Sequence, residues 1–156
     1  MLLLAALAGL LIDAAALPLL EDQFGDQDGP SRHPTGLVVL LCGAPDRLRA
    51  MKRWEEGLRP QLGEAAQFLR LIDGRSIPEQ RREAAKATLR EQVPPDISIL
   101  LDWEGRYWHA LQLQSATVEL AFLRDGRLLP YRVSGRWNAG SAANLVERLE
   151  RFGALR

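Results

Sequence analysis

The chain has 156 residues, of which 47% are apolar and 26% charged, enough to bury the core of one globular domain. Twenty basic and twenty acidic side chains give a formal net charge of zero, and every basic stretch has carboxylates beside it. A chain without a basic patch lacks the electrostatic footprint of a nucleic-acid-binding protein. Composition therefore favours a single domain and excludes nucleic acid as a partner.

The N-terminus is the most apolar part of the chain. Residues from Met1 to Ile12 are all apolar or small, a run shorter than the about 20 residues that span a bilayer. This run is typical of a secretory signal, and Ala14 and Ala16 are small residues of the kind that a signal peptidase reads. We therefore predict a signal peptide over residues 1–16 and export to the periplasm or cell envelope. No Lys or Arg precedes the run, which leaves an uncleaved anchor, or a buried N-terminal helix in a cytoplasmic protein, as alternatives.

The first predicted elements form a strand followed by a helix. Residues 17–36 are rich in Asp, Gly and Pro and predict a loop or edge hairpin. The continuous apolar run from Leu37 to Cys42 is typical of a parallel strand that is buried on both faces. Asp46 is expected to cap the helix that follows, and Pro60 and Gly63 mark its end.

The rest of the chain continues the alternation and then changes pattern. The predicted elements are a strand over Phe68–Asp73, a helix from Pro78 to Pro94, a strand over Ile97–Leu101, a short helix over Trp108–Leu113, strands over Val118–Leu123 and Arg127–Val133, and a last helix capped by Ser141. Parallel strands thus come first, and an antiparallel hairpin with a helix comes last. This order indicates an α/β fold with a mixed central sheet.

Several segments resemble the redoxin branch of the thioredoxin-fold proteins, which includes membrane-tethered thioredoxins of cytochrome maturation and proteins similar to alkyl hydroperoxide reductase (AhpC/TSA-like). The most specific segments are DQFG at Asp22–Gly25, DWEGRYWHAL at Asp102–Leu111 and FLRDGRL at Phe122–Leu128. The resemblance covers roughly residues 19–152. It implies a thioredoxin-like three-layer sandwich over residues 37–156.

The chain departs from this family at its catalytic elements. The resemblance implies a Cys-x-x-Cys pair at the start of the first helix, where the helix dipole stabilises a thiolate. Those two positions fall on Asp46 and Arg49. The proline, usually in the cis form, that precedes the hairpin strand in the family falls near Val118, within a segment that contains no proline. We therefore expect a degenerate member that is not a disulfide oxidoreductase and carries no cofactor.

Cys42 is the only cysteine, so it cannot form an internal disulfide. At the end of an apolar strand it is expected to be buried as a small packing residue. The alternative is a lone reactive thiol, activated by the amides of the following helix. The two histidines lack the spacing of a metal site: His33 is expected to be solvated and His109 to be a half-buried packing residue.

The remaining candidates concern binding. The basic helix start, with Arg47, Arg49, Lys52 and Arg53, could bind an anion, but a solvated helix face balanced by Glu55 and Glu56 is favoured. In the segment from Arg132 to Asn138, Trp137 could anchor an interface or cover the core. The candidate binding surface consists of Asp46, Arg47, Arg49, Val118, Arg136 and Trp137.

These observations predict a non-catalytic binding or assembly role in the cell envelope, with an unidentified protein or peptide partner. Membrane contact is expected only if the N-terminal segment is not cleaved. The alternative function is a single-thiol redoxin, an enzyme that acts through Cys42 by forming mixed disulfides.

Overall fold

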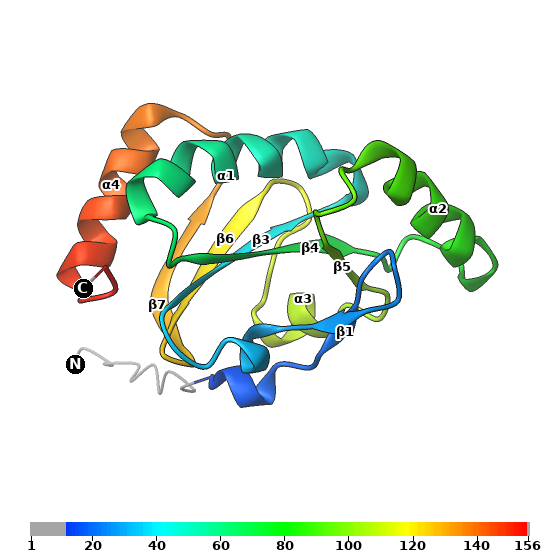
Figure 1. The fold of residues 1–156 in the computed structure, drawn as a ribbon, viewed down its shortest axis with the longest axis horizontal. Coiled ribbons are helices and arrows are strands. Elements are labelled where there is room, and N and C mark those ends of the chain that lie inside the picture. Colours follow the sequence, from blue (N-terminus) through cyan, green and yellow to red (C-terminus); the bar gives the residue numbers. More distant parts are fainter. Residues whose placement is uncertain (1–11, 156) are drawn as a thin grey trace, which may run out of the picture.

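A five-stranded mixed sheet forms the centre of the protein in the computed structural model, which describes residues 12–155 (Figure 1). From one edge to the other, its strands are β5 (Ile99–Asp102), β4 (Gln67–Asp73), β3 (Leu37–Gly43), β6 (Glu119–Arg124) and β7 (Arg127–Ser134). The pairs β3–β4 and β4–β5 are parallel, whereas β3–β6 and β6–β7 are antiparallel. The predicted order, parallel strands first and an antiparallel hairpin last, is confirmed.

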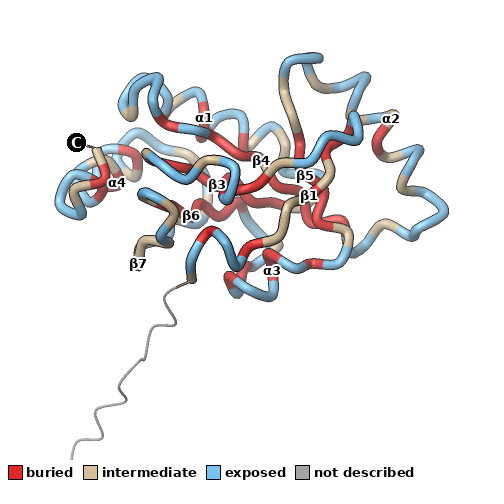
Figure 2. Tube along the Cα trace, turned by 60° about the horizontal axis from the view of Figure 1, so that its bottom comes forward, coloured by how far each residue is buried: buried red, intermediate tan, exposed pale blue. Residues whose placement is uncertain are grey.

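The central strand β3 is buried along its whole length, as its continuous apolar sequence predicts. Its side chains alternate between two clusters on opposite faces of the sheet. Val39 and Leu41 belong to one cluster, whereas Val38, Leu40 and Cys42 belong to the other. Figure 2 shows the buried residues concentrated in the central strands. The sheet is therefore the middle layer of a three-layer sandwich.

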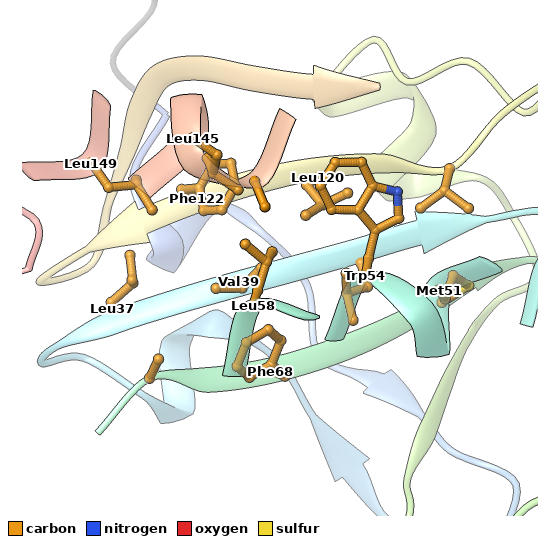
Figure 3. Close-up of a cluster of buried hydrophobic side chains, with 14 of the residues drawn as sticks. Leu37, Val39, Met51, Trp54, Leu58, Phe68, Leu120, Phe122, Leu145 and Leu149 are labelled. Atoms are coloured by element: carbon orange, nitrogen blue, oxygen red, sulfur yellow. The ribbon is translucent and has the colours of Figure 1, made fainter. Parts of the chain in front are cut away.

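Helices α1 (Leu48–Leu62) and α4 (Ala139–Arg151) cover one face of the sheet (Figures 1 and 3). The inward side chains of α1 recur at helical spacing and are Met51, Trp54 and Leu58. Those of α4 are Ala142, Leu145 and Leu149. These side chains pack on Val39, Phe68, Leu120 and Phe122 of the sheet in one continuous core.

The opposite face is covered by the short helix α3 (Arg106–Ala110) and by the N-terminal part of the chain, which contains a small hairpin of β1 (Leu20–Glu21) and β2 (Gln27–Asp28). Tyr107 of α3 is fully buried, and its hydroxyl donates a hydrogen bond to the carbonyl of Pro18 at 2.7 Å. The predicted N-terminal hairpin is therefore present and closes the second face.

Helix α2 (Arg82–Gln92) lies beyond the β5 edge of the sheet rather than over a face (Figure 1). Lys86 ties it to the N-terminal hairpin, because its ammonium group lies 2.5 Å from the Glu21 carboxylate and 3.3 Å from that of Glu83. The hydrogen bonds that Lys86 donates, first of all the one to Glu21, raise its pKa against the opposing effect of burial.

Two predicted helix caps are wrong. Asp46 lies in a 3₁₀ turn, Pro45–Arg47, and its carboxylate contacts Arg47 at 3.6 Å instead of the amides of α1. Asn138, rather than Ser141, caps α4, because its side chain accepts a hydrogen bond from the backbone N–H of Ser141 at 2.8 Å. Ser141 thus occupies the third helical position, the one that an N-cap side chain reaches.

Residues Ile12 to Leu17 pack against the turn between β6 and β7. The Ala14 amide donates to the Gly126 carbonyl at 2.7 Å, and the Leu128 amide donates to the Ile12 carbonyl at 3.2 Å. Ala14 and Leu17 are 3% and 2% exposed. The remainder of the predicted signal peptide, residues 1–11, lies outside the described residues, and the predicted cut before Leu17 stays a prediction. None of the helices in residues 12–155 is long and apolar enough to cross a membrane.

Candidate functional site

The carboxyl ends of the parallel strands meet at one edge of the sheet, which is where α/β proteins commonly place their sites. Cys42 pairs with Glu119, so the loop that leads from β3 into α1 lies beside Val118. The Gly135 amide donates to the Val118 carbonyl at 3.0 Å, which brings the loop between β7 and α4 to the same edge. The structure therefore brings together the three chain segments that the sequence analysis selected.

The start of α1 carries charged side chains at the two positions that the resemblance assigns to cysteines. Asp46 has 74% of its side chain exposed, and the neighbouring Arg47 has 44%. Arg49 is exposed in the first turn of the helix. A carboxylate and a guanidinium cannot form or exchange a disulfide, so no dithiol chemistry can take place at this helix start.

Cys42 is 1% exposed and lies inside the sheet, four positions before Asp46. Burial, followed by the negative charge of the neighbouring Glu119, raises the pKa of its thiol far above the ordinary value. The thiol therefore stays protonated at physiological pH. The burial of Cys42 that the sequence predicts is confirmed.

Two residues of the predicted binding surface lie elsewhere than expected. Val118 is 2% exposed, because its side chain faces the core, so it offers this surface no side chain. Trp137 packs edge-on against Trp54 at 5.2 Å between ring centroids. It also covers Gly57 so closely that a Cβ there would lie 2.2 Å from the ring. Two interpretations were left open for Trp137, and the structure shows that its side chain covers the end of the core. Arg136, between these elements, is exposed.

A cleft of about 1330 Å³ runs along α1, and sequence reasoning did not find it. Its walls are α1 and the segment from Gln92 to Ile99 that follows α2, and Asp46 and Arg49 lie among its lining residues. Apolar side chains line part of it: Leu48, Met51, Val93, Ile97 and Ile99. The cleft therefore joins the helix start to a long, partly apolar groove.

A buried ion cluster forms part of the same cleft. Glu55 of α1 accepts hydrogen bonds from the guanidinium groups of Arg59 and of Arg70, which lies on β4. Arg70 is bound through two nitrogens, and the side chains of Glu55 and Arg70 are only 11% and 14% exposed. The expectation that Glu55 lies on the solvated face of this helix is wrong, because Glu55 as a whole residue is 8% exposed and faces Arg70. The role of Glu55 depended on Arg70, which lies on a different element.

The acidic side chains at this edge are held by structural partners. Burial alone would raise the pKa of Asp73, but hydrogen bonds from Arg75 and Ser115 outweigh that effect and lower it. The carboxylate of Asp102 accepts hydrogen bonds from the first two amides of α3, those of Arg106 and Tyr107, at 2.8 Å each. Both carboxylates therefore accept hydrogen bonds from neighbouring parts of the fold.

Both expectations for the histidines are wrong. His33 is half-buried and lies 3.0 Å from the carboxylate of Asp28, because the two face each other across a short turn. His109 is exposed, since the inward face of α3 is filled by Tyr107 and Trp108. In the part of the chain that the structure describes, no group of three or more His, Cys, Asp or Glu side chains could hold a metal ion.

Comparison with solved structures defines the fold. The exposed lipoprotein thioredoxin Etrx1 of Streptococcus pneumoniae matches with a TM-score of 0.66 at 17% identity, over 85% of this chain and 98% of that one. The N-terminal domain of PilB from Neisseria meningitidis matches with a TM-score of 0.61 at 15% identity, over 82% of this chain and 90% of that one. A secreted disulfide oxidoreductase of Mycobacterium tuberculosis matches with a TM-score of 0.56 at 16% identity, over 86% and 96%. No family model and no curated protein matches the chain.

The protein therefore has a thioredoxin-like fold, as the sequence predicted. At these identities the likeness concerns the fold alone. The chemistry has to be argued from the residues of this chain, among which there is a single cysteine.

Proposed function

We propose that this protein is a degenerate member of the redoxin branch that binds a protein or peptide partner and has no thiol-disulfide activity. The observation that carries the proposal is the pair of exposed charges, Asp46 and Arg49, at the helix start, together with the 1% exposure of Cys42. Thiol-disulfide exchange needs an accessible thiolate to attack and a second thiol to resolve the mixed disulfide. Neither is available at this edge of the described fold.

The exposed part of the candidate surface supports a binding role. Asp46, Arg47, Arg49 and Arg136 remain exposed where the three segments meet. The adjoining cleft along α1 combines apolar lining with charged side chains, a composition that suits a polypeptide segment better than a small apolar molecule.

The proposed location is the periplasm or cell envelope. The apolar run from Met1 to Ile12 supports export. Two of the similar structures are described as an exposed lipoprotein and a secreted oxidoreductase, which agrees with this location. N-terminal sequencing of protein recovered from the envelope tests it: a start at or near Leu17 supports a cleaved signal peptide, and a soluble cytoplasmic protein that retains Met1 contradicts export.

The second candidate is a single-thiol redoxin that uses Cys42. Its support is that several similar structures are thioredoxins or disulfide oxidoreductases. For this function the thiol must become exposed, since burial raises its pKa and shields its sulfur from a disulfide substrate.

Insulin reduction and peroxide consumption test the proposal. The protein is expected to give no turnover above a buffer blank, with an ordinary thioredoxin as the positive control. Turnover that disappears in Cys42→Ser would contradict the proposal and assign the activity to Cys42.

A further inference from the structure

The outer edge of β7 is open over most of its length. The N-terminal segment pairs only with the start of the strand, where the Leu128 amide donates to the Ile12 carbonyl at 3.2 Å and Asp13 bridges Arg127. Beyond Leu128, the only strand of residues 12–155 that pairs with β7 is β6, on its inner side. This end of the sheet therefore presents unpaired backbone groups.

The register shows which backbone groups face outward. The Gly135 amide points to β6, where it donates to the Val118 carbonyl at 3.0 Å. Backbone direction alternates along an antiparallel strand, so Val133 also faces β6, whereas Arg132 and Ser134 direct their N–H and C=O groups away from the sheet. These are the groups with which an added strand would pair.

Helix α4 flanks this open edge. A crevice of about 320 Å³ lies between the end of β7 and the helix, and α4 contributes Ser141, Asn144 and Arg148, which share one helix face. An extended peptide that adds to a sheet edge beside a helix gains backbone hydrogen bonds from the strand and side-chain selection from the helix. The crevice provides both features.

The charges at the crevice favour an acidic peptide. Its lining includes two arginines, Arg132 and Arg148, and no carboxylate. The guanidinium of Arg148 lies 4.8 Å above the ring of Tyr131 and makes no ion pair with any of residues 12–155. Arg132 has 37% of its side chain exposed and reaches toward Glu119, 3.8 Å away, on the other face of the sheet. Side chains of an added strand alternate between the two faces, so neighbouring acidic residues would meet Arg148 on one side and Arg132 on the other.

We propose that an extended acidic peptide adds as a sixth strand to the outer edge of β7 at Arg132–Ser134 and that Arg148 selects its charge. The proposal names a partner class and a second surface for the binding role proposed above, and it rests on that role only in assuming a peptide partner. Pro130 and the arginines could instead protect the edge from any pairing, which the experiment distinguishes.

Nitrogen-15 NMR titration of the full chain tests the proposal with two probes, acetyl-Thr-Val-Glu-Glu-Thr-Val-amide and the same peptide with Lys in place of Glu. The acidic peptide is expected to shift the amides of Arg132 and Ser134 most and to bind more tightly than the basic one. Arg148→Ala should weaken binding about fivefold, as expected for one partly exposed ion pair. The control Arg151→Ala should leave the affinity unchanged, because Arg151 pairs with Glu147 and does not line the crevice.

A backbone variant tests strand addition itself. Ser134→Pro removes an outward N–H without removing a hydrogen bond to β6, so it should keep the melting temperature and abolish binding. Equal binding of both peptides, no binding of either, or undiminished binding to Ser134→Pro would overturn the proposal. Concentration-dependent shifts of the same amides without peptide would also overturn it, since they would show pairing with a second copy. Insulin turnover is measured separately, so the two proposals can fail independently.

Discussion

Glu55→Ala is expected to destabilise the protein mainly by leaving Arg70 without a partner. The side chain of Arg70 is 14% exposed and that of Glu55 is 11% exposed, whereas Arg59 is 47% exposed. Removing one member of a buried ion pair costs about 3–5 kcal/mol, whereas an exposed pair contributes less than about 1 kcal/mol. For a domain of this size, a loss of about 3–5 kcal/mol in the free energy of unfolding lowers the melting temperature of Glu55→Ala by about 6–20 °C.

Thermal unfolding followed by circular dichroism measures this loss in a double-mutant cycle. One cycle, with Glu55→Ala, Arg70→Ala and the double variant, gives the coupling energy between Glu55 and Arg70. A second cycle, with Arg59→Ala in place of Arg70→Ala, gives the coupling energy between Glu55 and Arg59. We expect the coupling of Glu55 with Arg70 to be several times that with Arg59. Replacing both Glu55 and Arg70 by Leu should restore most of the stability, since no buried charge then remains unpaired. A melting temperature of Glu55→Ala within about 2 °C of wild type, or a larger coupling with Arg59, would refute this reasoning.

Three further predictions concern pH, capping and the N-terminus. Burial raises the pKa of Cys42 above its ordinary 9.0, so its contribution to stability is complete below pH 9 and falls as pH rises. Urea titrations at pH 9 and 10 should show a loss of up to about 1.4 kcal/mol per pH unit from Cys42, and Cys42→Ala should keep only the smaller loss from groups such as Tyr107, whose pKa burial also raises. Asn138→Ala should cost about 1 kcal/mol in the same assay and Ser141→Ala clearly less, because only Asn138 caps α4; equal costs would contradict the cap. A chain that starts at Leu17 should melt below one that starts at Ile12, because it lacks two backbone hydrogen bonds to the β6–β7 turn, each worth about 1 kcal/mol. Equal melting temperatures would show that the segment adds no stability.

The sheet was predictable because each strand carries its own signal. The run from Leu37 to Cys42 is apolar at every position, which only a strand buried on both faces explains well, and the observed strand extends by one residue to Gly43. The hairpin of β6 and β7 was equally readable from Asp125 and Gly126, which both adopt positive φ in the turn.

Features that depend on two distant elements were not predictable. The sequence analysis placed Glu55 on a solvated helix face, because its partner Arg70 comes from β4 and faces it only through the sheet register and the position of α1. The cleft along α1 likewise depends on where the segment after α2 crosses the edge of the sheet.

The candidate surface was predicted in part. Asp46 lies in the turn just before α1 and Arg49 in the first turn of that helix, because the lengths of the preceding strand and turn fix these positions. Val118 proved to be buried and Trp137 half-buried. The exposure of each side chain depends on which other element packs against it, and the local sequence does not determine that packing.

The reactivity of Cys42 toward a thiol reagent tests the central claim most directly. At pH 8 the folded protein is expected to react with 5,5′-dithiobis(2-nitrobenzoate) at least on the order of 10³-fold more slowly than the urea-unfolded chain, because reaction requires unfolding that costs at least about 5 kcal/mol. The matched control is Cys42→Ser combined with Asp46→Cys, which moves the one thiol to the exposed helix start and should react rapidly when folded. Reaction of native Cys42 within about tenfold of that control would show an accessible thiolate and contradict the account.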